Sequence, residues 1–221
     1  LDPTIEIDWR MNEGDSVAAN QTLCELRGTA RPLLTGERTA LNFLQTLSAV
    51  ASASRVCADA VTGTRARILD TRKTIPGLRL AQKYAVRIGG STNHRIGLYD
   101  GILIKENHII SAGGIAAAVQ RARAQKSTVL LEVEVENLTQ AGEAMAAGAD
   151  RLLLDNFSIE QMRDAVALRD RQSPSTTLEA SGGINFETLR PVAETGVDFI
   201  SIGALTKNIR AVDLSMRFRF E

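Results

Sequence analysis

The chain has 221 residues with 26 basic and 26 acidic side chains, so its formal net charge is zero. A neutral chain has no overall field to attract nucleic acid or a membrane surface, and no apolar run approaches the roughly 20 residues of a membrane helix. Apolar residues make up 44% of the chain and aromatic residues only 4%, so Leu, Ile, Val and Ala must form the core, as in parallel strands buried on both faces. The length allows one large domain and part of a second.

The first thirty residues predict β structure, because Ile5, Ile7 and Trp9 alternate with polar residues before a turn at 12–15 and a second strand at 23–26. The chain starts without methionine and enters a strand almost at once, so we expect it to begin inside a domain. A structural half-sandwich is favoured over a lipoyl-type carrier domain, since the carrier lysine expected in a tight Met-Lys hairpin is missing.

A helix is predicted next, from about Leu33 to Val61, where apolar residues recur on one face. Strand-like runs and helices then alternate. The strands are predicted at 67–70, 102–104, 129–131, 152–154, 177–180 and 199–202, and the helices at 77–88, 113–126, 138–148, 158–171 and 185–195. This repetition predicts right-handed crossovers and an α/β fold, a parallel β/α barrel that is open or incomplete.

The end of the chain differs from the barrel segments, because residues 214–220 alternate with period two. This pattern predicts a half-exposed antiparallel strand that pairs with the first thirty residues. We therefore expect a small, incomplete half-sandwich domain from residues 1–32 and 210–221, and a barrel from residues 33–209.

Cys24 and Cys57 lie far apart and form no CxxC motif. Buried thiols in a reducing compartment are favoured over a disulfide or a metal site, which predicts a cytoplasmic protein.

Two glycine-containing segments predict a phosphate site. Residues 181–184 (SGGI) open a helix after one strand, and residues 202–206 (IGALT) follow the next strand. Glycines let backbone N–H groups approach an anion, and a helix N-terminus adds the positive end of its dipole. Paired loops late in an α/β barrel are the usual phosphate site of that architecture.

Cations and acids follow the strand-like runs. The cations are Arg72, Lys73, His94, Arg95 and Lys105, and the acids are Glu132, Glu134 and Asp155. Because barrel strand ends meet in one mouth, the cations indicate a ligand with several negative charges. Carboxylates opposite a phosphate site commonly hold Mg²⁺ or ribose hydroxyls.

Several longer motifs closely resemble the quinolinate phosphoribosyltransferase family, the type II phosphoribosyltransferases of NAD biosynthesis. They are residues 36–42 (GERTALN), 71–79 (TRKTIPGLR), 89–100 (GGSTNHRIGLYD), 104–108 (IKENH), 153–156 (LLDN) and 179–184 (EASGGI). The resemblance spans about residues 3–221, although the family normally carries some seventy more residues before Leu1. It implies transfer of the phosphoribosyl group of phosphoribosyl pyrophosphate to quinolinate, with loss of CO₂, by a homodimer that uses Mg²⁺.

The resemblance also implies residue roles. Quinolinate would contact Arg38 of the other subunit and Arg72, Lys73, His94, Arg95 and Lys105 of the same subunit. Phosphoribosyl pyrophosphate would contact Lys73, Lys105, Glu132, Asp155, Asn156, Ser181, Gly182, Gly183, Gly203 and Lys207. Lys73, Glu132 and Asp155 would be catalytic, and Glu132 and Asp155 would hold Mg²⁺.

Two alternatives remain open at this point. A related phosphoribosyltransferase or pyrophosphorylase with a different acceptor, such as a paralogue linked to molybdate transport, would share most of these motifs. An inactive phosphate-binding barrel fragment would share the phosphate loops. The paired cations at 72–73 and 94–95 favour a dicarboxylate acceptor over the first alternative, and the intact acids and cations argue against the second.

Overall fold

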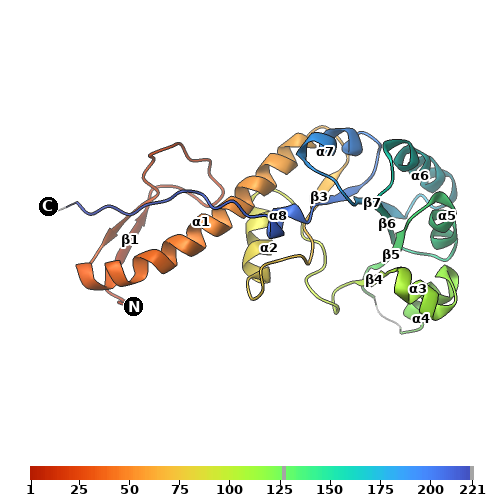
Figure 1. The fold of residues 1–221 in the computed structure, drawn as a ribbon, viewed down its shortest axis with the longest axis horizontal. Coiled ribbons are helices and arrows are strands. Elements are labelled where there is room, and N and C mark those ends of the chain that lie inside the picture. The colour runs from red at the N-terminus through yellow and green to blue at the C-terminus, as the bar shows by residue number, and fades with distance from the viewer. Residues whose placement is uncertain (126–127, 220–221) are drawn as a thin grey trace.

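The computed structural model describes residues 1–125 and 128–219. A β-hairpin of β1 (Glu6–Trp9) and β2 (Cys24–Arg27) is joined by the long helix α1 (Ala30–Ala60) to an α/β body (Figure 1). Cys24 is half-buried and Cys57 is buried, and both are free thiols. None of the helices within the described ranges is long and apolar enough to cross a membrane.

The body is built on a parallel sheet. Its strands are β3 (Arg67–Leu69), β4 (Ile102–Ile104), β5 (Leu131–Val135), β6 (Arg151–Asp155), β7 (Thr177–Ser181) and β8 (Phe199–Ser201), in the spatial order β3-β8-β7-β6-β5-β4. Every neighbouring pair is parallel, which confirms the predicted α/β fold. β3 and β4 end this order, and Thr92 forms one parallel bridge with Leu69 beside β3.

The helices that follow the strands along the chain are α2 (Arg79–Ile88), α3 (Glu106–Ala112), α4 (Ile115–Ala124), α5 (Leu138–Ala146), α6 (Ile159–Gln172), α7 (Phe186–Ala193) and the short α8 (Ala204–Lys207). Alternate strand residues face these helices and are apolar, with Val133, Leu152, Leu178 and Ile200 all fully buried. The residues between them point to the other face of the sheet, where polar side chains gather. The fold therefore separates an apolar helix-facing layer from a polar strand interior.

Local sequence explains several helix boundaries. Asn137, Ser158 and Asn185 each precede a helix, and each side chain accepts a hydrogen bond from a backbone N–H of the first turn. Five predicted helices after α1 are confirmed with shifts of at most two residues at each end, except that residue 126 of the predicted 113–126 lies outside the described residues. Helix α3 was not predicted, because it is short, starts almost directly after β4 and has no clear helical pattern of apolar residues.

Two expectations were wrong. β5 begins at Leu131 rather than ending there, so Glu132 and Glu134 lie within the strand and not after it. The period-two stretch near the C-terminus forms no strand over the described residues 208–219. This segment instead runs along α1, where the backbone N–H of Val212 donates to the carbonyl of Gln45 over 3.1 Å. Residue 220, the last of the predicted strand, lies outside the described residues.

Candidate functional site

The strand register brings four predicted or considered site residues to one edge of the sheet. Asp155 pairs with Ser181, and Glu134 pairs with Leu153, two residues before Asp155 on the same face of β6. Lys105 follows β4, and its Nζ lies 2.5 Å from Oε2 of Glu134. We call Lys105, Glu134, Asp155 and Ser181 the mouth layer, because they lie at the carboxyl ends of their strands.

Glu134 is the mouth-layer acid that the family resemblance did not single out. It is half-buried, whereas Glu132 is only 1% exposed. The two acids are two residues apart, so they lie on the same side of β5, and the direction of the strand puts Glu134 nearer its carboxyl end. The assignment of ribose and Mg²⁺ contacts to Glu132 stays a prediction. It would require the Glu132 carboxylate, which protein encloses, to contact a ligand.

The phosphate loops meet beside the mouth layer. Gly182 and Gly183 have φ values of +93° and +60°, and a Cβ on Gly182 would collide with the Asn156 side chain. A Cβ on Gly203 would lie 3.3 Å from Cδ of Lys73 and 4.0 Å from Cε of Lys207. The glycines thus let the backbone approach closely while two lysines converge on it, as an anion site requires.

Arg72 and Arg95 form a second cationic region. Nε of Arg72 is buried and finds no hydrogen-bond partner among the described residues. Burial and then the charge of Arg72 lower the pKa of the Arg95 guanidinium, and its Nη1 donates to the carbonyl of Gly101 over 2.9 Å. Two mutually repelling guanidinium groups with an unused donor are suited to a ligand with more than one carboxylate.

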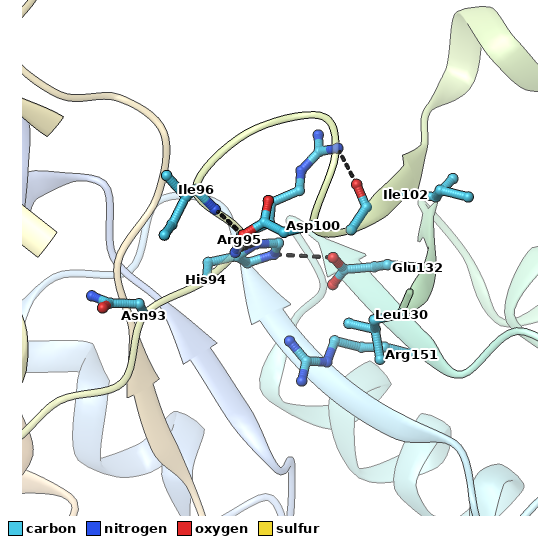
Figure 2. Close-up of a pocket in the computed structure, with 10 residues that line it drawn as sticks. Asn93, His94, Arg95, Ile96, Asp100, Ile102, Leu130, Glu132 and Arg151 are labelled. Carbon is cyan, nitrogen blue, oxygen red and sulfur yellow. Dashed lines mark hydrogen bonds and ion pairs between the residues drawn. The ribbon is translucent and has the colours of Figure 1, made fainter. Parts of the chain in front are cut away.

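Beneath the mouth layer lies a second group of charged residues, His94, Glu132, Arg151 and Glu179, which we call the interior cluster. Nε2 of His94 lies 3.0 Å from Oε2 of Glu132 and 3.4 Å from Oε2 of Glu179. Nη1 of Arg151 lies 3.3 Å from Oε2 of Glu179. Figure 2 shows the His94 ring directed at Glu132, and a cavity of about 300 Å³ opens on this region.

The pKa values of the cluster follow from burial and proximity. Burial lowers the pKa of His94, but hydrogen bonds and charges from Glu132 and Glu179 outweigh it and raise the pKa to about 9. Burial and the charge of Glu179 raise the pKa of Glu132 to about 7. Burial opposes ionisation of Glu179, yet His94 and Arg151 lower the pKa of its carboxyl group. The backbone N–H of Arg95 lies 2.7 Å from Nδ1 of His94, and Nε2 on the other side of the ring faces the two acids.

Asp70 and Lys83 also fix the segment that carries His94 and Arg95, on the side away from the two acids. Asp70 accepts hydrogen bonds from Nζ of Lys83 (2.6 Å), Nδ2 of Asn93 (2.8 Å) and the backbone N–H of His94 (2.8 Å). Nζ of Lys83 also donates to the carbonyl of His94 over 2.8 Å. Sequence analysis missed Lys83, because a lysine within a helix gives no sign of burial until its partner is placed.

Arg38 lies away from the other predicted site residues. It is exposed on the N-terminal half of α1, about 33 Å along the helix axis from Ala60 at 1.5 Å per residue. Figure 1 shows this half of α1 extending from the body toward the hairpin. A single chain therefore does not bring Arg38 to the cationic region.

The donor sets differ in their fit to Mg²⁺. Asp155 and Glu134 offer carboxylate oxygens at the mouth, which suits an ion shared with phosphate oxygens. His94, Glu132 and Glu179 offer atoms within 4.8 Å of one another, but the two acids are at most 1% exposed, whereas an ion shared with a bound phosphate needs carboxylates that open to the ligand. Mg²⁺ therefore fits the mouth layer and not the interior cluster.

Comparisons with known proteins agree with this geometry. Residues 50–217 match the family described as "Quinolinate phosphoribosyl transferase, C-terminal domain", and residues 1–48 match its N-terminal domain. The chain is 43% identical to a nicotinate-nucleotide pyrophosphorylase (carboxylating) of Mycobacterium leprae, over 94% of the chain and 73% of that protein. It is 39% identical to the human protein of the same name, over 96% of the chain and 72% of that protein. A solved nicotinate-nucleotide pyrophosphorylase from Francisella tularensis is 51% identical with a TM-score of 0.92, over 96% of this chain and 74% of that one.

Proposed function

The chain belongs to the quinolinate phosphoribosyl transferase family, and on that premise we propose that it transfers the phosphoribosyl group of phosphoribosyl pyrophosphate to quinolinate. The products are nicotinate mononucleotide, pyrophosphate and CO₂. This reaction is a step of NAD biosynthesis. The observation that carries the choice of acceptor is the proximity of the Arg72 charge to Arg95, together with the unused Nε of Arg72. Quinolinate has two adjacent carboxylates, which match two guanidinium groups.

The donor would lie across the mouth. The backbone at residues 181–183 and Gly203 would hold the 5′-phosphate, with Lys73 and Lys207 beside it. Asp155 and Glu134 would face the ribose, and Asn156 would flank it; Lys105 pairs with Glu134 and borders both substrates. Mg²⁺, when bound by Asp155 and Glu134, would neutralise the leaving pyrophosphate.

Catalysis would depend on positioning and electrostatics. The arginines and Lys73 would orient the quinolinate ring so that its nitrogen attacks the anomeric carbon as pyrophosphate departs. The carboxylates of Asp155 and Glu134 would stabilise positive charge that develops at that carbon. The bond to the C2 carboxylate then breaks to release CO₂, its electron pair is stabilised by the cationic ring nitrogen, and C2 takes up a proton.

We also propose a cytoplasmic homodimer in which Arg38 of one subunit completes the acceptor site of the other. The exposed position of Arg38, far from the cations of its own chain, supports this arrangement.

An acceptor assay tests the function. Purified protein with phosphoribosyl pyrophosphate and Mg²⁺ should form nicotinate mononucleotide, measured by absorbance, from quinolinate but not from nicotinate. Arg72→Met should raise the KM for quinolinate, whereas Arg67→Met, the same change on the exposed amino end of β3, should not. Equal turnover of nicotinate, or of an acceptor without two carboxylates, would contradict the proposal and favour a related transferase.

A further inference from the structure

The interior cluster contains more charge than the proposed chemistry uses. Glu132 and Glu179 are 1% and 0% exposed, and Oε1 of each is buried without a hydrogen-bond partner among the described residues. Burying a carboxylate with an unsatisfied oxygen costs free energy, so these acids do not act simply as stabilising groups. What the two acids gain from this buried position is their contact with His94.

The segment from Thr92 to Arg95 depends on side chains for its position. Thr92 is the last residue that pairs with a strand, through its bridge to Leu69. Beyond it, Asp70 and Lys83 hold the backbone at His94 from one side. On the other side, the imidazole reaches the two acids inside the sheet, as Figure 2 shows for Glu132.

Arg95 follows His94 directly and is coupled to its ring. The backbone N–H of Arg95 contacts Nδ1 of His94, and the opposite ring nitrogen is bound by the acids. With both nitrogens engaged, His94 has no free ring nitrogen for a ligand in this arrangement. Rotation of the ring would displace the Arg95 backbone and thus its guanidinium, which lies within reach of the Arg72 charge.

We infer that Glu132 and Glu179 are positioning residues, which hold His94 and through it set Arg95 against Arg72 to receive the acceptor's carboxylates. This inference rests on the proposed function and changes two expectations that the family resemblance gave. Glu132 acts on the acceptor side and not on the ribose or Mg²⁺, and His94 acts through its neighbour and not by touching quinolinate.

Existing contacts distinguish this role from a metal site. Nε2 of His94 and Nη1 of Arg151 already engage Oε2 of the two buried acids, so these oxygens have partners without an added ion. Removal of either acid would take a partner from the imidazole and free the ring to turn.

The test measures binding of each substrate to the free enzyme by isothermal titration calorimetry. Glu132→Gln and Glu179→Gln should each weaken quinolinate binding roughly tenfold or more. Both should leave binding of phosphoribosyl pyrophosphate with Mg²⁺ within about twofold, because the proposed donor contacts lie in the mouth layer and the phosphate loops and not in the interior cluster. Glu134→Gln, two residues along the same strand, is the matched control and should show the opposite pattern.

Two further variants separate the outcomes. Glu132→Asp keeps the charge but withdraws it from His94, so it should weaken quinolinate binding as Glu132→Gln does, and it replaces that variant in the test if Glu132→Gln fails to fold. The double variant His94→Asn with Glu132→Gln should bind quinolinate no more weakly than His94→Asn alone, because both changes break one path.

Other results would overturn the inference. If the Glu132 variants bind phosphoribosyl pyrophosphate more weakly but quinolinate normally, Glu132 contacts the ribose or its metal ion and does not position His94. Additive effects in the double variant, or a stoichiometric metal ion in the wild type that both Gln variants lose, would also contradict it. A wild type that does not bind quinolinate would overturn the proposed function itself, whereas normal binding in the wild type and all variants would overturn this inference alone.

Discussion

The mouth layer and the interior cluster lie one above the other on the same strands, yet their charges are arranged differently. In the mouth layer, Lys105 is half exposed and pairs with a half-buried Glu134, so water can reach both charges. In the interior cluster, His94 is 10% exposed and its acid partners are at most 1% exposed. A pair that solvent reaches can exchange its partner for a substrate, whereas an enclosed pair is costly to open.

This difference assigns different work to the two layers. The mouth layer provides charges that a ligand can recruit, and the interior cluster with Asp70 and Lys83 provides a fixed frame for the cations above. Substitutions in the mouth should therefore affect turnover more than stability, and substitutions in the frame should affect stability or binding. Single substitutions in each layer can break that division.

The largest effect on stability is expected from Lys83→Met in the frame. Lys83 is 3% exposed and Asp70 is fully buried, so the variant leaves a buried carboxylate without its cation. Breaking such a pair costs about 3–5 kcal/mol of unfolding free energy. Urea unfolding measures the loss, with Arg87→Met on the exposed face of the same helix as control. A loss below about 1 kcal/mol, the usual worth of an exposed pair, would mean that Asp70 is satisfied without Lys83.

The mouth layer should behave in the opposite way. Asp155→Asn removes a carboxylate that faces the reacting ribose, so kcat should fall by roughly 10²–10³-fold while the thermal midpoint changes little. Steady-state kinetics and calorimetry measure the two quantities. Asp164→Asn on an exposed turn of α6 makes the same chemical change away from the site and should alter neither. An unchanged kcat would show that Asp155 is structural.

Sequence could predict the mouth layer better than the frame, for a physical reason. Parallel strands end at one edge, so residues such as Asp155 and Ser181 are brought together by the order of elements alone. The partners of His94 depend on which way a segment outside the regular strands turns, and no periodicity encodes this. The sequence around Lys83 predicts a solvent-exposed helix position, and Lys83 is buried only because α2 brings it to Asp70 and to the carbonyl of His94. Glu132 and Glu134 were also predicted to follow the strand, because acidic residues usually mark the end of a buried strand. Here they lie inside β5, since the face of the sheet away from the helices is polar.

The shared-site proposal predicts complementation between two inactive chains. Arg38→Ala should weaken quinolinate binding by roughly 2–3 kcal/mol, near the lower end for a charge facing a ligand, because the side chain is exposed in the single chain. Lys105→Ala should inactivate the active site of its own subunit, whereas Arg38→Ala should impair the site of the partner subunit. Mixed dimers of the two variants contain one site with both residues intact and should recover part of the activity. Verified mixed dimers without recovery would contradict a shared site.

The smallest expected effect is a pH dependence of stability that comes from the enclosed His94. The pKa of His94 is raised from 6.5 to about 9 in the folded chain, so its protonated form contributes stability that is complete below pH 6.5 and is lost as pH rises through about 9. The difference in thermal midpoint between wild type and His94→Asn should therefore shrink by a few degrees between pH 6.5 and pH 10. In a Glu132→Gln background the shrinkage should become smaller, because the acid that holds the proton is gone. A constant difference across this range would mean that the interior cluster does not keep His94 protonated, and that its acids act on the ring only as hydrogen-bond acceptors.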